Sequence, residues 1–426
     1  MKKFLPLILL AALTACTSTP QPAAPLATPT PEPTAEPVQS PPVSTLMPLT
    51  TRWNTGRDLY EFRWVGAASG TDSGILLQTD YDTLTQAPYC TVPDCAHDSD
   101  ACPAYLSDWS CMGVMAVDGT VYVYPTELHA GGNKTIYCVD PAGGRTAVTD
   151  APDELPDDLL FAWCDETSLY GTPYPTAHQP NTLYRWDWQN NTVQSVPLAA
   201  DETIVACDGT RFLTARVVTD GQWPTFGNKE QENAVYNSAR WEYDWLDPVD
   251  GTREKIFDRT YADGYFTAYY DGKIYYSGNF RNVYTDDQEC SLLYYDTADN
   301  TEKTLLETLP LNSYATDLSA SFVTAFAGAQ PQYIRAIEGS VPFDEYLLDI
   351  ETGELYPAPK ITVEGVTRPA VLAAVTADGR WVTMSNPRDS EDPAYDVYAL
   401  WDSDDYLAGG RPTAVGTGWP GASSPA

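Results

Sequence analysis

The sequence predicts an all-β protein in which a single β-propeller, with seven four-stranded blades, follows a disordered N-terminal stalk. Three observations predict this class. Short apolar or aromatic runs alternate with turn residues along the chain beyond residue 50. Pairs of these runs recur as hairpins, many of them built on Asp-Gly, with a period of about 40 to 60 residues that is typical of propeller blades. The 28 tyrosines and 12 tryptophans also favour strands.

The first element is an export signal. Met1-Lys2-Lys3 forms a basic start, an apolar run follows from Phe4 to Ala12, and small residues lead into Cys16. The apolar run is too short for a permanent transmembrane helix. The tetrad Leu13-Thr14-Ala15-Cys16 resembles a bacterial lipoprotein lipobox. This resemblance implies that residues 1–15 are a signal peptide and that Cys16 is the lipidated first residue of the mature chain.

The second element is a stalk. Residues 16–50 are rich in proline and threonine, with ten prolines between Thr17 and Thr50, and contain almost no large apolar side chains. Such a segment is extended, at about 3.1 Å per residue, and acts as a spacer. This reach favours a Gram-positive surface. We expect the folded domain to comprise residues 51–419 and a disordered tail to comprise residues 420–426.

The folded part consists of repeated pairs of hairpins. The first hairpin of a pair has an Asp-Gly turn or a relative of one, which is the strongest short-range hairpin signal because glycine supplies a positive φ. Its clear copies begin at Gly113, Leu159, Thr203, Thr267 and Val371. The second hairpin occurs seven times, at Ile75–Tyr89, Ile136–Val148, Leu183–Val196, Glu242–Phe257, Leu292–Leu306, Tyr346–Ala358 and Val397–Val415.

Seven copies predict seven blades, although imperfect repeats also allow a count of six or eight. The sixth module is the least regular, because its expected first hairpin, Ser321–Ala336, lacks the Asp-Gly turn. A pair of β-sandwiches would also show short strands and turns. Regular four-strand modules without a boundary linker favour the propeller over that alternative.

Repeats such as DGKIYYSG and SLLYYDTADN resemble those of bacterial surface lipoproteins that carry a TolB-like or YWTD-like β-propeller domain. The resemblance extends over residues 51–419. It implies a blade and a cell-surface protein, but it specifies no reaction, because propellers serve as hydrolases, lyases, receptors and scaffolds.

A cysteine cluster lies between the first and second blades. It comprises Cys90, Cys95, His97, Cys102 and Cys111. Exported chains with an even number of cysteines favour disulfides, whereas three cysteines and one histidine also suit a structural zinc ion. Either chemistry would fasten this polar loop, so we expect a structural role for His97.

Two further cysteines, Cys164 and Cys207, each precede a turn aspartate in equivalent strands of adjacent modules. Repetition at one position indicates a core position, so we expect them to pack as small hydrophobic residues. Cys138 and Cys290 cannot be paired from their positions.

Candidate ligand-binding residues gather in the loops between the two hairpins of a module. In a propeller these loops share a face with the connections between blades, and rigid scaffolds present ligand-binding residues on loops. Inheritance of a repeated loop sequence is the preferred explanation of the two histidines, and local packing is the preferred explanation of each single aromatic residue. The candidates are His129, His178, Trp223, Phe226, Tyr236, Trp241, Arg281 and Tyr284.

The composition limits the function. A formal net charge of -35 leaves no basic surface for phosphate backbones, so nucleic-acid binding is disfavoured. The motif of a nucleophile elbow, of a zinc protease or of a P-loop does not occur in the sequence. Aspartate-rich turns such as Asp296–Asn300 suit calcium, but aspartate is also a common turn former.

These features predict a non-enzymatic, monomeric binding or scaffolding protein. It would be lipid-anchored on the outer face of the cell membrane, or on the periplasmic side in a double-membraned cell, and would recognise a cell-wall glycan, a peptide or a surface protein. No cofactor is expected beyond structural zinc or calcium. The alternative is a hydrolase or lyase that acts on extracellular polysaccharide through paired loop carboxylates.

Overall fold

The structure is a computed structural model that describes most of the chain beyond residue 44. The chain divides into two units, Met1–Pro41 and Pro42–Ala426, and every described residue belongs to the second. The described residues are 45–49, 52–65, 73–107, 112–219, 234–235, 238–278, 291–308, 317–319, 332–338, 344–363, 365–385 and 397–419. Among these residues, no helix is long and apolar enough to cross a membrane.

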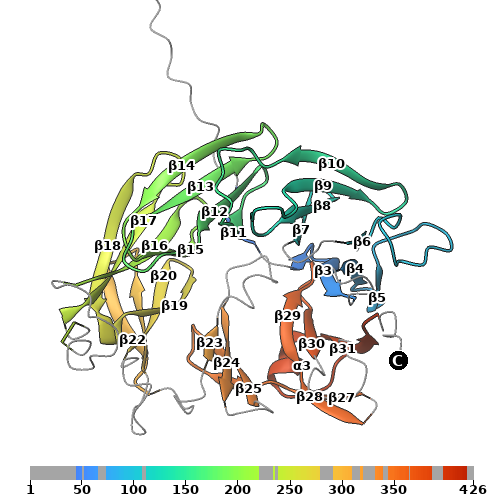
Figure 1. The fold of residues 1–426 in the computed structure, drawn as a ribbon. Helices are drawn as coiled ribbons and strands as arrows, with labels where there is room; N and C mark the ends of the chain where they lie inside the picture. The colour runs from blue at the N-terminus through green and yellow to red at the C-terminus, as the bar shows by residue number, and fades with distance from the viewer. Residues whose placement is uncertain are drawn as a thin grey trace, which may run out of the picture. The chain divides into compact units, whose positions relative to one another are not determined.

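The second unit is a seven-bladed β-propeller, as the sequence predicts. The sheets follow one another in chain order from blue to red (Figure 1). Blade 1 contains β2 (Arg52–Asn54), β3 (Asp58–Trp64), β4 (Gly74–Asp80) and β5 (Thr85–Pro88); blade 2, β7 (Met112–Val117), β8 (Thr120–Pro125), β9 (Thr135–Asp140) and β10 (Gly144–Asp150); blade 3, β11 (Leu159–Cys164), β12 (Ser168–Pro173), β13 (Asn181–Asp187) and β14 (Thr192–Leu198); and blade 4, β15 (Glu202–Cys207), β16 (Phe212–Val218), β17 (Arg240–Leu246) and β18 (Arg253–Thr260).

The remaining blades have the same order of strands. Blade 5 contains β19 (Tyr265–Tyr270), β20 (Lys273–Gly278), β21 (Ser291–Asp296) and β22 (Thr301–Leu306); blade 6, β23 (Asp317–Ser319), β24 (Tyr333–Glu338), β25 (Asp344–Asp349) and β26 (Leu355–Pro357); and blade 7, β29 (Val371–Val375), β30 (Trp381–Ser385), β31 (Val397–Trp401) and β32 (Ala414–Thr417). Short elements outside these sheets are β27 (Lys360–Val363), β28 (Val366–Pro369), η1 (Tyr261–Asp263) and α3 (Ser403–Leu407).

The Asp-Gly turns join the first two strands of a blade, as predicted. In blade 2, Asp118 and Gly119 have φ values of 49° and 75°, and in blade 5, Asp271 and Gly272 have values of 45° and 73°. Two successive residues with positive φ make the primed turn that matches the twist of a hairpin. These two hairpins are therefore closed by two-residue turns whose geometry follows from the sequence.

The blades share a bulge as well as a turn. The pairing of the innermost strand with the second strand shifts by one residue near the same point in blades 3, 4, 5 and 7. The shifts lie between Phe161 and Trp163, Ile204 and Ala206, Phe266 and Ala268, and Leu372 and Ala374. A bulge increases local twist, so its recurrence gives these inner strands a common shape.

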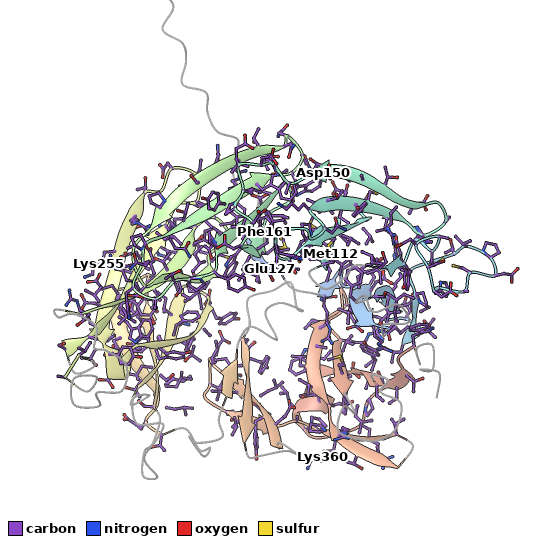
Figure 2. All side chains as sticks on the ribbon, viewed as in Figure 1. Met112, Glu127, Asp150, Phe161, Lys255 and Lys360 are labelled. Atoms are coloured by element: carbon purple, nitrogen blue, oxygen red, sulfur yellow. The ribbon has the colours of Figure 1, made fainter. Side chains whose placement is uncertain are left out.

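Seven clusters of buried side chains occur among the described residues, and each lies between two adjacent blades. Strand alternation explains this arrangement, because successive side chains point to opposite faces of a sheet. In β7, for example, Val114 packs toward blade 1 and Met115 toward blade 3. Figure 2 shows Met112 and Phe161 among the side chains that fill the spaces between sheets. Each blade is therefore buried on both faces.

The ring closes between blades 7 and 1 without a shared strand, because each four-stranded blade is made from one continuous stretch of chain. Leu59, Tyr81 and Leu84 of blade 1 form an apolar cluster with residues of blade 7. Backbone contacts add to it, since the Ala377 amide donates to the Gly56 carbonyl at 2.7 Å. Side-chain packing and hydrogen bonds thus replace a strand exchange.

Residues just before β2 extend blade 3. Strand β1 (Met47–Pro48) pairs antiparallel with β11, the innermost strand of that blade. The Leu46 amide donates to the Gly209 carbonyl at 2.8 Å, and the Leu46 side chain is only 2% exposed. The expected boundary at residue 51 is therefore too late, because the last residues of the expected stalk find backbone partners and an apolar site on blades 3 and 4.

The sixth blade differs from its prediction. Its first strand is Asp317–Ser319 and its second is Tyr333–Glu338, so the first hairpin begins before the predicted Ser321. Without an Asp-Gly turn the sequence does not mark the hairpin's centre. Residues 320–331, between the two strands, lie outside the described part of the chain.

Candidate metal centre

The predicted cysteine cluster lies on an excursion from the edge of blade 1. Strand β5 pairs with the second half of β4, from Leu77 to Asp80. Strand β6 (Tyr105–Leu106) pairs with Gly74 and Ile75 at the start of β4. The chain therefore leaves the sheet edge after Pro88 and returns to it at Tyr105. We call residues 89–104 the cysteine loop. Its return is fixed by the Leu76 amide, which donates to the Ala104 carbonyl at 2.8 Å.

Four potential metal ligands converge in this loop. The three cysteine sulfurs and a ring nitrogen of histidine all lie within 4.8 Å of one another. His97 Nδ1 is 3.2 Å from Cys102 Sγ. Cys102 is buried, whereas the other three are half-buried. The ligand set is Cys90, Cys95, His97 and Cys102.

Backbone geometry turns amide donors toward two of the sulfurs. The backbone N–H of His97 donates to Cys95 Sγ and lowers the pKa of that thiol. The backbone amides of Ala104 and Tyr105 donate to Cys102 Sγ. Asp94 and His97 have φ values of 56° and 55°, so the loop uses two left-handed residues to make these approaches.

The cysteine loop is docked against blade 2. The Thr91 amide donates to the Pro141 carbonyl at 2.8 Å. Arg145, on β10, forms an ion pair with Asp100 at 2.9 Å and donates to the Tyr105 carbonyl. The loop therefore joins the outer parts of two adjacent blades, as the sequence predicts for a connection between blades 1 and 2.

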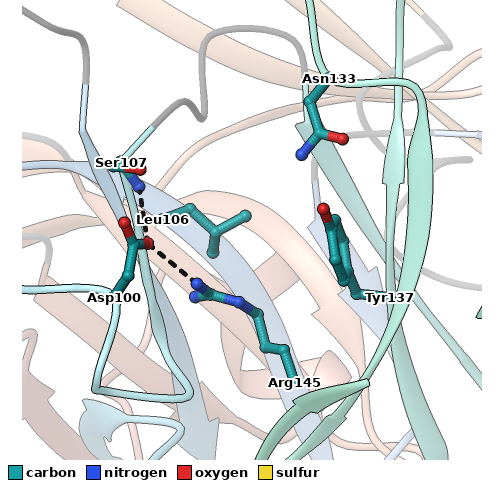
Figure 3. A pocket seen from close by; sticks show the side chains of 6 residues that line it. All are labelled: Asp100, Leu106, Ser107, Asn133, Tyr137 and Arg145. Carbon is teal, nitrogen blue, oxygen red and sulfur yellow. Dashed lines mark hydrogen bonds and ion pairs between the residues drawn. The ribbon is translucent and has the colours of Figure 1, made fainter. Parts of the chain in front are cut away.

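A small cavity lies beside this contact (Figure 3). Its volume is about 250 Å³. The loop side supplies Asp100, Leu106 and Ser107, and blade 2 supplies Asn133, Tyr137 and Arg145. Sequence analysis missed Arg145, because a single arginine in a strand carries no signal of the distant loop that it contacts.

The two candidate histidines lie in corresponding loops, between the second and third strands of blades 2 and 3. His178 is exposed, and its Nδ1 lies 2.9 Å from an Asp201 carboxylate oxygen. His129 is half-buried, and its ring packs against Gly132, where a Cβ atom would lie only 2.3 Å from it. The surroundings of the two histidines therefore differ, despite their equivalent positions.

Trp241 is half-buried in an aromatic group at the start of β17. Its ring stacks on Tyr261 at a centroid distance of 5.6 Å, and its Nε1 donates to the Tyr261 carbonyl at 3.3 Å. These contacts match the local packing that the sequence also allowed. The other candidates lie outside the described residues: Cys16, Cys111, Trp223, Phe226, Tyr236, Arg281 and Tyr284.

Cys164 and Cys207, which precede equivalent turn aspartates in blades 3 and 4, pack with apolar side chains as predicted. Cys164 is 1% exposed, and burial raises the pKa of its thiol. Burial also raises the pKa of the Cys207 thiol to about 11, and this thiol donates to the Leu46 carbonyl. The six described cysteines are all free thiols. In the aspartate-rich turn at Asp296–Asn300, Asp296 accepts a hydrogen bond from the Ala298 amide and Asp299 accepts one from the Thr301 amide.

No protein family and no curated protein matches the chain. Among solved structures, the β-propeller domain of the Trilobed protease from Pyrococcus furiosus is 9% identical, with a TM-score of 0.48 over 85% of this chain and 94% of that chain. An acylaminoacyl peptidase of Pyrococcus horikoshii is 11% identical, with a TM-score of 0.45 over 84% of this chain and 51% of that chain.

An oligogalacturonate lyase in complex with manganese is 12% identical, with a TM-score of 0.40 over 87% of this chain and 85% of that chain. The chain is similar to these three structures in fold alone.

Proposed function

We propose that this chain is a lipid-anchored extracellular protein whose propeller binds a glycan, a peptide or a protein through its loop face, without catalysis. The loop face is the one that carries the loops between second and third strands and the connections between blades. The opposite face, which carries the turns between first and second strands, is the turn face.

The propeller scaffold carries this proposal, because rigid scaffolds present ligand-binding residues on their loops. Two of the candidate residues, His129 and His178, lie in such loops, between the second and third strands of blades 2 and 3. Met47 and Pro48 pair with β11, and the Leu46 amide donates to the Gly209 carbonyl, so the segment before blade 1 is fixed to blades 3 and 4.

The sequence of the preceding residues supports the anchor. The lipobox-like tetrad ends at Cys16, and the residues up to Ser44 have a composition typical of an extended spacer. Two or more acyl chains on one cysteine give stable membrane attachment, whereas a single chain gives marginal attachment. The spacer would give the loop face access to ligands away from the membrane.

Fractionation of cells tests the anchor. We expect the intact chain to appear in the membrane fraction and to incorporate labelled fatty acid. Cys16→Ser should remove both properties, while Cys138→Ser, at a cysteine on β9, should retain them. Recovery of the Cys16→Ser protein in the membrane fraction at the same level would contradict lipid anchoring.

A screen tests ligand recognition. The full chain with Cys16→Ser is titrated with cell-wall fragments, glycans and surface proteins, and each ligand is afterwards analysed by mass spectrometry. We expect saturable binding that Trp223→Ala weakens by about tenfold or more and that Tyr356→Ala, on the outermost strand of blade 6, leaves unchanged. Chemical conversion of a bound glycan would replace the binding function with the hydrolase or lyase alternative.

A further inference from the structure

The cysteine loop contains a complete set of ligands for one tetrahedral metal ion. With zinc–sulfur bonds of about 2.3 Å, neighbouring ligand atoms of a tetrahedral site are roughly 3.8 Å apart. The four donor atoms of the loop already lie within 4.8 Å of one another. Thiolates and imidazole together select a borderline-soft ion such as Zn²⁺ over calcium or magnesium, which require oxygen ligands.

Disulfide chemistry fits the same atoms less well. All three cysteines are free thiols, and a disulfide between any two of them would use only part of the converged set of four ligands. His97 Nδ1 lies 3.2 Å from Cys102 Sγ. A disulfide does not use this ring nitrogen, whereas a metal ion would bind it together with the sulfurs. The backbone donors to Cys95 and Cys102 are also arranged as outer contacts of thiolates, since such hydrogen bonds orient and stabilise metal-bound ligands.

We propose that Cys90, Cys95, His97 and Cys102 bind one Zn²⁺ in a closed structural site. Four protein ligands leave no open position for a substrate, which is the distinction between structural and catalytic zinc. This inference is independent of the proposed function, because it concerns how the propeller is held together.

The position of the site indicates what the ion stabilises. Cys90 lies two residues after the end of β5, and Cys102 lies three residues before the start of β6, so the ion would connect the two halves of the interrupted edge of blade 1. Two residues of the loop contact blade 2. The Thr91 amide donates to the Pro141 carbonyl, and Asp100 forms an ion pair with Arg145. Binding of the ion would therefore order the loop and, through it, the outer junction of the first two blades.

Metal analysis of the full chain in detergent tests the site. Protein purified without added metal or chelator should contain one zinc per chain. Exchange for Co²⁺ should produce the absorption of a tetrahedral thiolate complex, with sulfur-to-cobalt charge-transfer bands. Cys102→Ser should reduce the zinc affinity by more than the roughly 10–100-fold that loss of an outer-shell partner costs. Cys138→Ser, a matched cysteine outside the cluster, should keep the full zinc content.

A second pair of variants separates metal binding from folding. His97→Ala should lose zinc, whereas His97→Cys should recover it, because a set of four cysteines is also a tetrahedral zinc site. Both replacements occupy the same left-handed backbone position, so any backbone strain is similar in the two. Peptide mapping that finds a disulfide between two of the three cluster cysteines, in protein that contains no zinc, would overturn the proposal. Equal zinc content in Cys102→Ser and the unaltered chain would overturn it as well.

Discussion

The Tyr398 phenol on blade 7 donates a hydrogen bond to the Glu61 carboxylate on blade 1, although 337 residues separate them in the chain. Glu61 is only 2% exposed and also receives a contact from Arg52 Nε at 2.6 Å. Gln86 Nε2 donates to the same carboxylate at 2.8 Å and to the Tyr398 oxygen at 3.0 Å. This polar network lies where the ring closes, beside the apolar cluster of blades 7 and 1.

We expect Tyr398→Phe to destabilise the protein by about 1.5–3 kcal/mol, because it removes a buried hydrogen bond to a charged group. Urea denaturation followed by tryptophan fluorescence measures this loss. Tyr295→Phe is the matched control, since the Tyr295 hydroxyl donates to the neutral Asn300 side chain within blade 5. Its expected cost is about 0.5–1.5 kcal/mol. A larger loss for Tyr295→Phe would show that the closure network is not the more important contact.

A buried carboxylate on blade 4 should make stability depend on pH. Burial by itself raises the pKa of Glu242, but the hydrogen bond and charge of Arg216 and the charge of Lys255 outweigh it and hold the pKa below its usual value of 4.5. A lowered pKa stabilises the folded state above the unfolded pKa, and this contribution disappears as the pH falls through the folded value.

Glu242→Gln should therefore lower stability by about 1 kcal/mol at pH 7, with the difference from the unaltered chain shrinking below about pH 4.5. Urea midpoints measured from pH 7 to pH 3.5 would reveal it. Glu254→Gln, at an exposed carboxylate that pairs with Arg211, should stay within about 0.5 kcal/mol of the unaltered chain. A constant effect of Glu242→Gln across this range would exclude the lowered pKa.

The segment before blade 1 should contribute to the stability of blades 3 and 4. Leu46 packs against Tyr170, Phe212 and Leu246, among others. We expect Leu46→Ala to cost about 2 kcal/mol, at the lower end for a buried leucine, since a terminal segment can detach locally. Leu49→Ala, at a half-buried position in the same segment, should cost less. Hydrogen exchange of the Leu46 amide, which donates to Gly209, would report the detachment directly.

Gly119, in the turn of blade 2, should matter for stability because of its backbone conformation and not because a side chain would clash there. Gly119 has a φ of 75°, and a Cβ atom added to it would meet nothing within 4 Å. Gly119→Ala should cost about 1–2 kcal/mol through the left-handed conformation, while Gly119→Asn should cost less because asparagine tolerates that region. Thermal unfolding of both variants measures the difference. Equal losses would indicate that the turn changes its conformation.

Much of the fold could be predicted because it depends on local signals. The Asp-Gly turn at Asp118 and the alternation of apolar residues on each side of it locate β7 and β8 without any knowledge of distant contacts. The sixth blade shows the limit, since its first hairpin lacks that turn and was placed too far along the chain. Four of the five cluster residues lie together because a short loop brings ligands that are close in sequence into contact, whereas the return of that loop to β4 of blade 1 has no sequence signal.

The sequence by itself thus determined the repeated hairpins, with a count of six to eight blades, and a cluster of cysteines and histidine that either disulfides or zinc would explain. Only the tertiary structure decided that Met47 and Pro48 pair with β11, that Arg145 holds the cysteine loop, and that Tyr398 meets Glu61 at ring closure. The physical reason is the range of the interactions. Turn and strand preferences act between near neighbours, whereas these contacts join residues that approach only after the blades have packed.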